Sequence, residues 1–282
     1  MHTLFLLCGA VTVAFVLLIS VYLIVSGLPA IQKIGLTDFL LGSTWASTAT
    51  TVEPSYGILP FLLTSIYGTA GAVVLGVPVG LLTAVFLAKV AGEKTALVIR
   101  TAVELLAGIP SVVYGLVGMI VLVPAVQRGF GLASGACLLS AILVLAVMIL
   151  PNIVSVSETA LRAVPREYEE ASLALGATEM ETVFRVSIPA ARSGVAAAIV
   201  LGVGRAIGET MAIIMVAGNV ANLPGLFTSV RFLTTAIASE MSYAAVGSLQ
   251  QQALYSIGLV LFLFIMLINI LLNLCIKKRK EG

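Results

Sequence analysis

The chain has 282 residues, of which 60% are hydrophobic and only 10% are charged, and its formal net charge is +2. Its mean hydropathy is +1.15. These values exclude a soluble globular domain, and so small a net charge does not favour nucleic-acid binding. The composition therefore indicates an integral membrane protein.

Six apolar stretches are long enough for a helix to cross the hydrocarbon core, which takes about 20 residues. They cover residues 4–27, 58–89, 99–125, 132–156, 193–217 and 252–276. We therefore expect an all-α protein with six transmembrane helices and both termini on the same side. The expected division is a first transmembrane helix with an external loop (1–57), a five-helix core (58–276) and a basic cytoplasmic tail (277–282).

Two of these stretches have features of their own. The first is too long for the core of a signal peptide and no basic residue precedes it, so we expect an uncleaved span. The second contains Gly68, Gly71, Gly76, Pro78 and Gly80. This spacing favours close packing between helices, with a kink as the alternative.

Lysine and arginine predict the orientation, because the cytoplasmic loops of membrane proteins carry an excess of both. One side of the predicted protein carries three of them, Lys33, Arg128 and Arg231. The other side carries eleven, namely Lys89, Lys94, Arg100, Arg162, Arg166, Arg185, Arg192, Lys277, Lys278, Arg279 and Lys280. The asymmetry places both termini in the cytoplasm.

Two predicted external loops are long for simple connections. Residues 28–57 include Trp45 and Tyr56, and residues 218–251 include Arg231 and Glu240. The loops form either a surface for an external partner or a short cover at the membrane interface, and the sequence favours neither. The three cysteines are isolated and the only histidine is His2, so we expect no disulfide, metal site or cofactor.

A polar stretch at residues 163–190 predicts two short cytoplasmic helices. Pro165 and the acidic residues after it suit a helix start, and Gly176 suits a left-handed helix end. Thr178 and Glu181 then have the spacing of a capping box, and Pro189 marks the end of the second helix. An amphipathic element on the membrane surface is one explanation, but its acidic character favours a docking surface for a cytoplasmic protein.

The same stretch resembles the EAA loop of the permease subunits of ABC importers. The matching residues are Glu170-Ala171-Ser172, then Gly176, then Val186-Ser187-Ile188-Pro189, at the spacing of that pattern. Ser172, Val186 and Ile188 depart from its usual residues. The resemblance implies that Glu170, Ala171 and Gly176, together with Glu169, belong to coupling helices that seat on an ATP-binding subunit.

A narrower resemblance extends over most of the chain. The blocks at residues 56–70, 104–118, 161–178, 188–194 and 204–219 are similar, in order, to PstC-type permeases of phosphate ABC importers. The resemblance implies a type I ABC importer (MetI-like) fold and phosphate import. It also implies as partners a PstA-like second permease subunit, two copies of a cytoplasmic ATP-binding subunit and an external phosphate-binding protein.

Arg205 and Glu209 are charged residues inside the fifth predicted span. An arginine at the centre of a membrane helix costs about 2.5–3.5 kcal/mol, so a functional role is the default expectation. On one helix, residues four apart share a face, and a guanidinium offers donors that match an oxyanion. An ionised carboxylate only accepts hydrogen bonds, so it would repel sulfate but could accept a hydrogen bond from a phosphate that still carries a proton.

Other interpretations of this pair stay open. Glu209 either contacts substrate or only orients Arg205, and an ion pair that holds helices together is the structural alternative. The family resemblance implicates Arg205 and Glu209 in phosphate passage, with Thr210 as a weaker neighbour. Ser111 and Tyr114 fit helix packing better than a path, and we expect a mainly structural role for Glu104.

The energy source must lie outside the chain, because no G-x-x-x-x-G-K-[ST] motif for ATP binding occurs in it. We therefore expect a non-catalytic membrane subunit. Two alternatives remain: an ABC permease for sulfate, molybdate or another small solute, and an ion-coupled carrier or channel. The helical elbow at 163–190 argues against the second, which has no need of an ATPase docking site.

Overall fold

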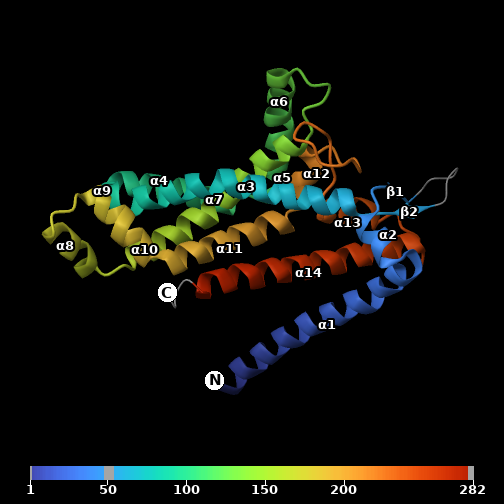
Figure 1. Ribbon diagram of the computed structural model, residues 1–282, viewed down its shortest axis with the longest axis horizontal. Helices are drawn as coiled ribbons and strands as arrows, with labels where there is room; N and C mark the ends of the chain where they lie inside the picture. Colours follow the sequence, from blue (N-terminus) through green and yellow to red (C-terminus); the bar gives the residue numbers. More distant parts are fainter. Residues whose placement is uncertain (1, 48–53, 279–282) are drawn as a thin grey trace.

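The protein is a bundle of long helices in the computed structural model, which describes residues 2–47 and 54–278. The long helices are α1 (His2–Ile34), α3 (Leu59–Val85), α4 (Glu93–Gly108), α7 (Leu138–Arg162), α11 (Arg192–Gly208) and α14 (Leu249–Lys278). They run along the length of the molecule (Figure 1). The expected all-α fold is confirmed, apart from one small sheet.

Short elements close the two ends of the bundle (Figure 1). One end, which we call the sheet end, carries α2 (Leu36–Leu41), the paired strands β1 (Trp45–Ala46) and β2 (Ser55–Tyr56), and α13 (Leu233–Glu240). The other, the elbow end, carries α8 (Arg166–Ala174), α9 (Glu179–Thr182), the π-helical turn η3 (Val183–Ser187) and α10 (Ile188–Ala190). The start of α1 and the end of α14 both point toward the elbow end.

Five helical stretches among the described residues are long and apolar enough to cross a membrane. They are Thr3–Ile34, Leu59–Val90, Ser111–Phe130, Leu138–Arg162 and Leu249–Leu271. Residues Glu179–Ala190 and Arg192–Gly208 add a sixth if the two helices, bent by 70° at their junction, count as one span. The basic tail predicted at 277–282 lies mostly outside the described residues.

The predicted third span at 99–125 is wrong as a single helix. α4 ends at Gly108, Ile109 and Pro110 are extended, and the chain resumes as α5 (Ser111–Val117), η2 (Gly118–Leu122) and α6 (Val123–Phe130). The reason is local, since a residue before proline is driven out of the helical conformation. Beyond this break, α6 projects from the side of the bundle (Figure 1).

The predicted fourth span at 132–156 is displaced, because α7 begins only at Leu138 and extends to Arg162. The preceding residues form a loop that packs tightly on α6. A Cβ atom at Gly135 would lie 1.9 Å from the carbonyl oxygen of Val123. The end of α7 can carry charge because its carboxylate, Glu158, forms ion pairs with Arg100 and Arg162.

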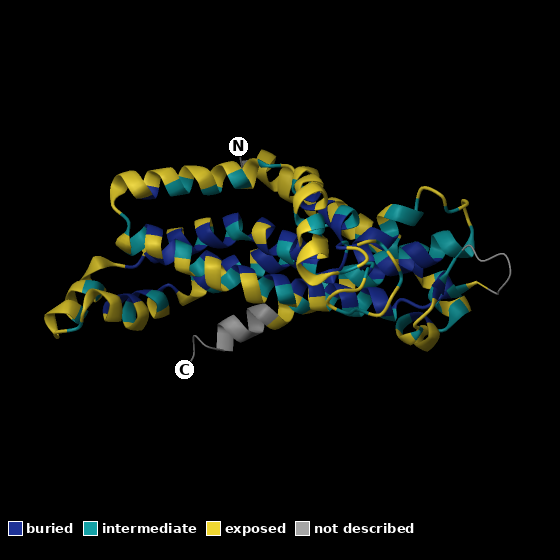
Figure 2. Ribbon diagram, turned by 90° about the horizontal axis from the view of Figure 1, so that it is seen from above, coloured by how far each residue is buried: buried dark blue, intermediate teal, exposed yellow. Residues whose placement is uncertain are grey.

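Close packing of α3 against α7 forms the centre of the bundle. A Cβ atom at Gly76 would lie 2.8 Å from Cδ1 of Ile149, and one at Gly80 would lie 2.7 Å from Cγ2 of Ile153. Gly71, Gly76 and Gly80 therefore admit isoleucines of α7, and Gly68 admits the ring of Phe232, which confirms that these glycines serve close packing. Figure 2 shows the buried residues along these central helices and many exposed residues at the elbow end.

Candidate functional site

The helix that carries Arg205 breaks at Glu209. α11 ends at Gly208, Glu209 is extended (φ −70°, ψ 135°), and α12 (Met211–Val216) begins after Thr210. Glu209 is therefore the residue directly after α11, and the regular helix that carries Arg205 does not continue past it.

The side chain and the backbone carbonyl of Glu209 each form a hydrogen bond at this break. Its Oε1 atom accepts a hydrogen bond from the backbone N–H of Ala212 at 3.1 Å. Its carbonyl oxygen accepts one from the hydroxyl of Thr234 at 2.8 Å. The Thr210 hydroxyl lies 3.4 Å from the carbonyl oxygen of Gly208, a long contact. Glu209 thus satisfies backbone groups that the break would otherwise leave unpaired.

Arg205 lies in the last turn of α11 and is half-buried. Among the described residues, the four ion pairs do not include Arg205 or Glu209. The alternative of a mutual ion pair that holds helices together is therefore absent from this conformation. A half-buried guanidinium without a carboxylate partner is able to receive an anion.

A second helix break lies at Ile109–Pro110. α5, which follows the extended residues Ile109 and Pro110, packs against α12. A Cβ atom at Gly115 would lie 2.8 Å from Cα of Ala212, so the two short helices touch through their backbones. The short helices that follow the two breaks thus pack against each other, and interrupted helices of this kind recur where transporters bind their substrates.

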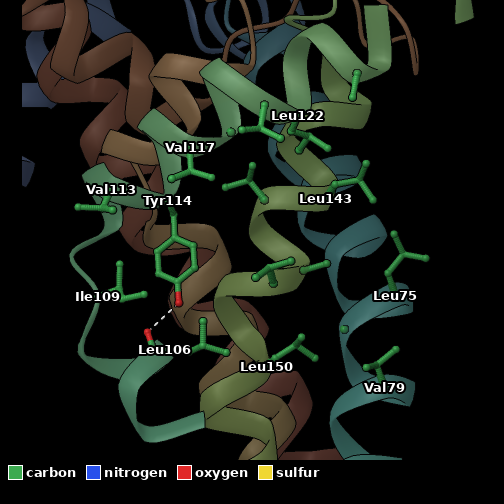
Figure 3. A pocket seen from close by; sticks show the side chains of 17 residues that line it. Leu75, Val79, Leu106, Ile109, Val113, Tyr114, Val117, Leu122, Leu143 and Leu150 are labelled. Carbon is green, nitrogen blue, oxygen red and sulfur yellow. Dashed lines mark hydrogen bonds between the residues drawn. The ribbon is translucent and has the colours of Figure 1, made fainter. Parts of the chain in front are cut away.

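An apolar groove of about 760 Å³ lies between α3, α7 and the 106–125 segment (Figure 3). Tyr114 lines it, and its hydroxyl donates to the carbonyl oxygen of Leu106 at 2.7 Å, across the second break. No charged side chain lines this groove. It is therefore unsuited to an anion, and the packing role expected for Tyr114 fits its surroundings. Ser111 is not among the lining residues.

The elbow has the local structure that its sequence predicts. Thr178 and Glu181 form a capping box at the start of α9, and Gly176 has φ +89°, the left-handed conformation that favours glycine. Pro165 precedes α8 directly. The helix after Gly176 continues through Pro189 to Ala190, where the 70° bend leads into α11.

The coupling residues implied by the EAA resemblance divide into two groups. Glu170, Ala171 and Gly176 are exposed. Five large apolar side chains around them are exposed too, with Leu175 at 90%, together with Tyr168, Leu173, Met180 and Phe184. Exposed apolar side chains interspersed with carboxylates along a short segment are typical of a surface that binds another protein.

Glu169, in contrast, points into the chain. It forms an ion pair with Lys89 of the π-helical turn η1 (Phe86–Val90) and accepts a hydrogen bond from the hydroxyl of Ser187 at 2.7 Å. Burial raises the pKa of Glu169, but the hydrogen bonds from Lys89 and Ser187, with the nearby positive charges, outweigh burial and lower it. Glu169 therefore holds the elbow to the bundle.

A buried carboxylate that the sequence analysis did not single out lies at the elbow end of α7. Glu158 is 5% exposed and accepts hydrogen bonds from Arg100 at 2.6 Å and from Arg162 at 2.9 Å. Arg162 also donates to the carbonyl oxygen of Leu87 at 2.9 Å. The sequence clue to Glu158 was Arg162, which lies four residues further on, because that spacing suits an ion pair on a helix. Glu104, expected to be structural, lines a small polar pocket beside this cluster.

A second cluster that the sequence analysis did not assemble lies at the sheet end. Glu240 accepts hydrogen bonds from Trp45 at 2.9 Å, Ser47 at 2.9 Å, Arg231 at 2.5 Å and Gln250 at 3.2 Å. We call these five residues the Glu240 cluster. Its members come from both of the predicted external loops, which therefore form one unit with a shared polar centre.

Comparison with known proteins agrees with this architecture. Residues 76–280 match the family model described as the binding-protein-dependent transport system inner membrane component. Among solved structures, a chain of the MetNI methionine ABC transporter in an inward-facing conformation aligns over 79% of this chain and 94% of its own. Its TM-score is 0.58 at 22% sequence identity, which shows a shared fold.

Relatives of known sequence cover nearly the whole chain. A probable ABC transporter permease protein, YqgH, of Bacillus subtilis is 39% identical over 94% of this chain and 87% of its own length. The phosphate transport system permease protein PstC of Haemophilus influenzae is 37% identical over 95% of this chain and 90% of its own. The chain therefore belongs to the binding-protein-dependent inner membrane permeases of ABC transporters, and within them to the PstC-type subunits.

Proposed function

We propose that this chain is the membrane-spanning subunit of an ATP-driven importer that carries inorganic phosphate into the cytoplasm. The similarity to PstC, a phosphate transport system permease, supports this assignment over most of the chain. The observation that carries it is the break at Gly208–Thr210, next to a half-buried arginine and a carboxylate within the bundle.

Arg205 supplies the attraction in this proposal. Its guanidinium stays charged and offers a planar fork of N–H donors to phosphate oxygens. Glu209 supplies the discrimination. One of its oxygens is bonded to Ala212, which leaves the other to accept a hydrogen bond from a protonated phosphate oxygen. Sulfate carries no such proton at neutral pH, so it would meet an unpaired carboxylate. Thr210 adds a hydroxyl beside them.

The partners follow from what the chain lacks and what it exposes. It has no Walker A motif, so ATP is hydrolysed by a separate subunit, which docks on the exposed elbow around Glu170, Ala171 and Gly176. A PstA-like second permease subunit, two copies of the ATPase and an external phosphate-binding protein complete the importer. The excess of lysine and arginine at the elbow end supports a cytoplasmic location for both termini.

The test is uptake of labelled phosphate by cells that lack their own high-affinity system and express the complete assembly. Wild-type uptake is expected to need the ATPase and to resist excess sulfate. Arg205→Gln is expected to abolish uptake, while Arg128→Gln, which removes an exposed arginine of α6, serves as the matched control. Glu209→Gln is expected to admit sulfate as a competitor, because the repelling charge is gone.

Each alternative has its own outcome in this assay. Competition by sulfate in the wild type would indicate an ABC permease for sulfate or another small solute. Uptake that persists with an inactive ATPase would indicate an ion-coupled carrier or a channel. Unchanged discrimination in Glu209→Gln would leave Glu209 only the role of orienting neighbouring groups. Immunoblots of the membrane fraction verify that every variant is inserted at the wild-type level.

A further inference from the structure

We propose that Thr234 is a positioning residue for Glu209, held in place by the short helix α13. The significance of this for transport rests on the function proposed above, in which Glu209 faces the substrate. The geometric part, that Thr234 fixes the break between α11 and α12, is independent of which substrate the protein carries.

The contact itself joins residues far apart in the sequence. The hydroxyl of Thr234 donates to the carbonyl oxygen of Glu209 at 2.8 Å. Because Glu209 has left the helical conformation, its carbonyl lacks the regular bond to a residue four positions on. An unpaired carbonyl within a membrane protein is costly, so the hydroxyl stabilises this particular backbone conformation.

Glu209 is held by two hydrogen bonds, one to its backbone and one to its side chain. Thr234 fixes the peptide plane that follows Glu209, and the N–H of Ala212 binds the Glu209 carboxylate at 3.1 Å. The direction of a side chain follows from its backbone, so loss of the Thr234 contact frees the carboxylate to turn. A carboxylate that turns discriminates less well between two anions of similar shape.

Thr234 is itself fixed, because both ends of α13 are tied down. At the start of the helix, the N–H of Leu233 donates to the hydroxyl of Ser65 on α3 at 3.1 Å. At its end, Glu240 is the centre of the Glu240 cluster at the sheet end. α13 therefore connects the sheet end of the molecule with the break at Glu209, over a length of about 12 Å.

The neighbouring Thr235 provides a matched control. Both hydroxyl residues are buried, Thr234 at 8% and Thr235 at 1% exposed. The Thr235 hydroxyl, however, bonds only locally, accepting from the N–H of Phe232 at 3.0 Å and donating to its carbonyl at 3.1 Å. Thr→Val at either position removes one buried hydroxyl at nearly constant volume, and only Thr234→Val removes the contact with Glu209.

Hydrogen exchange of the assembled transporter tests the geometry without reference to substrate. In Thr234→Val, amides of residues 209–216 are expected to exchange about fivefold faster, as for loss of one hydrogen bond. In Thr235→Val they should exchange at the wild-type rate, and Thr234→Ser should restore protection. Wild-type exchange of this segment in Thr234→Val would overturn the proposal.

Uptake in the assay above then tests the link to transport. Thr234→Val is expected to lower the ratio of phosphate to sulfate uptake about fivefold, whereas a variant that only folds poorly loses both activities in proportion. If the wild type carries no phosphate, the proposed function fails while the exchange result still decides the role of Thr234. If phosphate is carried and Glu209→Gln admits sulfate, an unaltered ratio in Thr234→Val refutes its positioning role alone.

Discussion

Gly115 illustrates how one residue sets the distance between the two helix breaks. A Cβ atom there would lie 2.8 Å from Cα of Ala212 and 2.9 Å from the sulfur of Met215. The first of these neighbours is backbone, which cannot rotate away as a side chain does. The contact between α5 and α12, and with it the geometry around Glu209, therefore depends on the absence of a side chain.

Gly115→Ala is accordingly expected to destabilise the protein by about 1–3 kcal/mol, the usual effect of overpacking. The matched control is Gly108→Ala, since nothing lies within 4 Å of a Cβ atom at that position. There the substitution should be neutral or stabilising by up to about 1 kcal/mol, because alanine favours a helix. Melting temperatures of the purified assembly measure the effect of each substitution. Equal values for Gly115→Ala and Gly108→Ala would contradict the close contact between Gly115 and Ala212.

The charged pair shows the limit of reasoning at this scale. The sequence identified Arg205 and Glu209 as exceptional, because charges inside an apolar span are costly. It predicted one uninterrupted helix through both residues, whereas α11 ends at Gly208. Glu209 instead binds the backbone of α12, and Arg205 has no carboxylate partner among the described residues. Their roles in the substrate path stay predictions.

Among the elements, the elbow was the most predictable and the broken helices were the least. Thr178, Glu181 and Gly176 act on their immediate neighbours, so their pattern determines the local structure wherever the elbow lies. The breaks at Ile109–Pro110 and Gly208–Thr210 interrupt apolar runs that have the length and composition of ordinary spans. Pro110 was a clue to the break at Ile109–Pro110, and Gly208, a residue type that often ends helices, was a weaker clue to the break at Gly208–Thr210.

The ion pair of Glu169 with Lys89 predicts a pH dependence for the elbow. The folded-state pKa of Glu169 is lowered, so its contribution to stability is present above the ordinary carboxyl pKa of 4.5 and is lost as the pH falls. At pH 7, Glu169→Gln should cost about 1–2 kcal/mol and lower the melting temperature by a few degrees. The variant and the wild type should converge as the pH falls below 4.5 and through the lowered folded-state pKa of Glu169.

Glu170→Gln is the control for this measurement, because Glu170 is exposed and has no ion pair in the described part of the chain. It should leave the melting temperature unchanged. If Glu170 faces the ATPase as proposed, Glu170→Gln should weaken the stimulation of ATP hydrolysis in the assembled transporter. A stability loss in Glu169→Gln that does not shrink as the pH is lowered from 7 into the acid range would show that the charge of Glu169 is not the cause.

For the whole molecule, the Glu240 cluster unites segments that are almost 200 residues apart. Trp45 and Glu240 meet at 2.9 Å, and Arg231 bonds both Glu240 and the carbonyl oxygen of Asn219. Asn219 follows α12 and has a positive φ of 55°, a conformation that asparagine tolerates. The cluster therefore joins the β1–β2 segment, the segment after α12 and the end of α13.

Glu240→Gln should weaken the Glu240 cluster, because an amide presents only one acceptor oxygen to four donors and carries no charge for Arg231. The expected cost is about 2–3 kcal/mol, seen as faster proteolysis within residues 35–58 and 217–251. Glu93→Gln, at an exposed carboxylate of α4, is the control. Wild-type resistance to proteolysis in Glu240→Gln would mean that apolar packing alone closes the sheet end.

The sequence by itself determined the membrane class, the helical fold, the local structure of the elbow and the family, because these depend on composition and on residues close together in the chain. Only the tertiary structure decided where the long helices break and what satisfies the backbone there. Thr234, Ser65 and Glu240 act on partners 25 to 195 residues away. A hydroxyl or a carboxylate in the sequence shows that it can form a hydrogen bond, but only packing of the chain selects its partner.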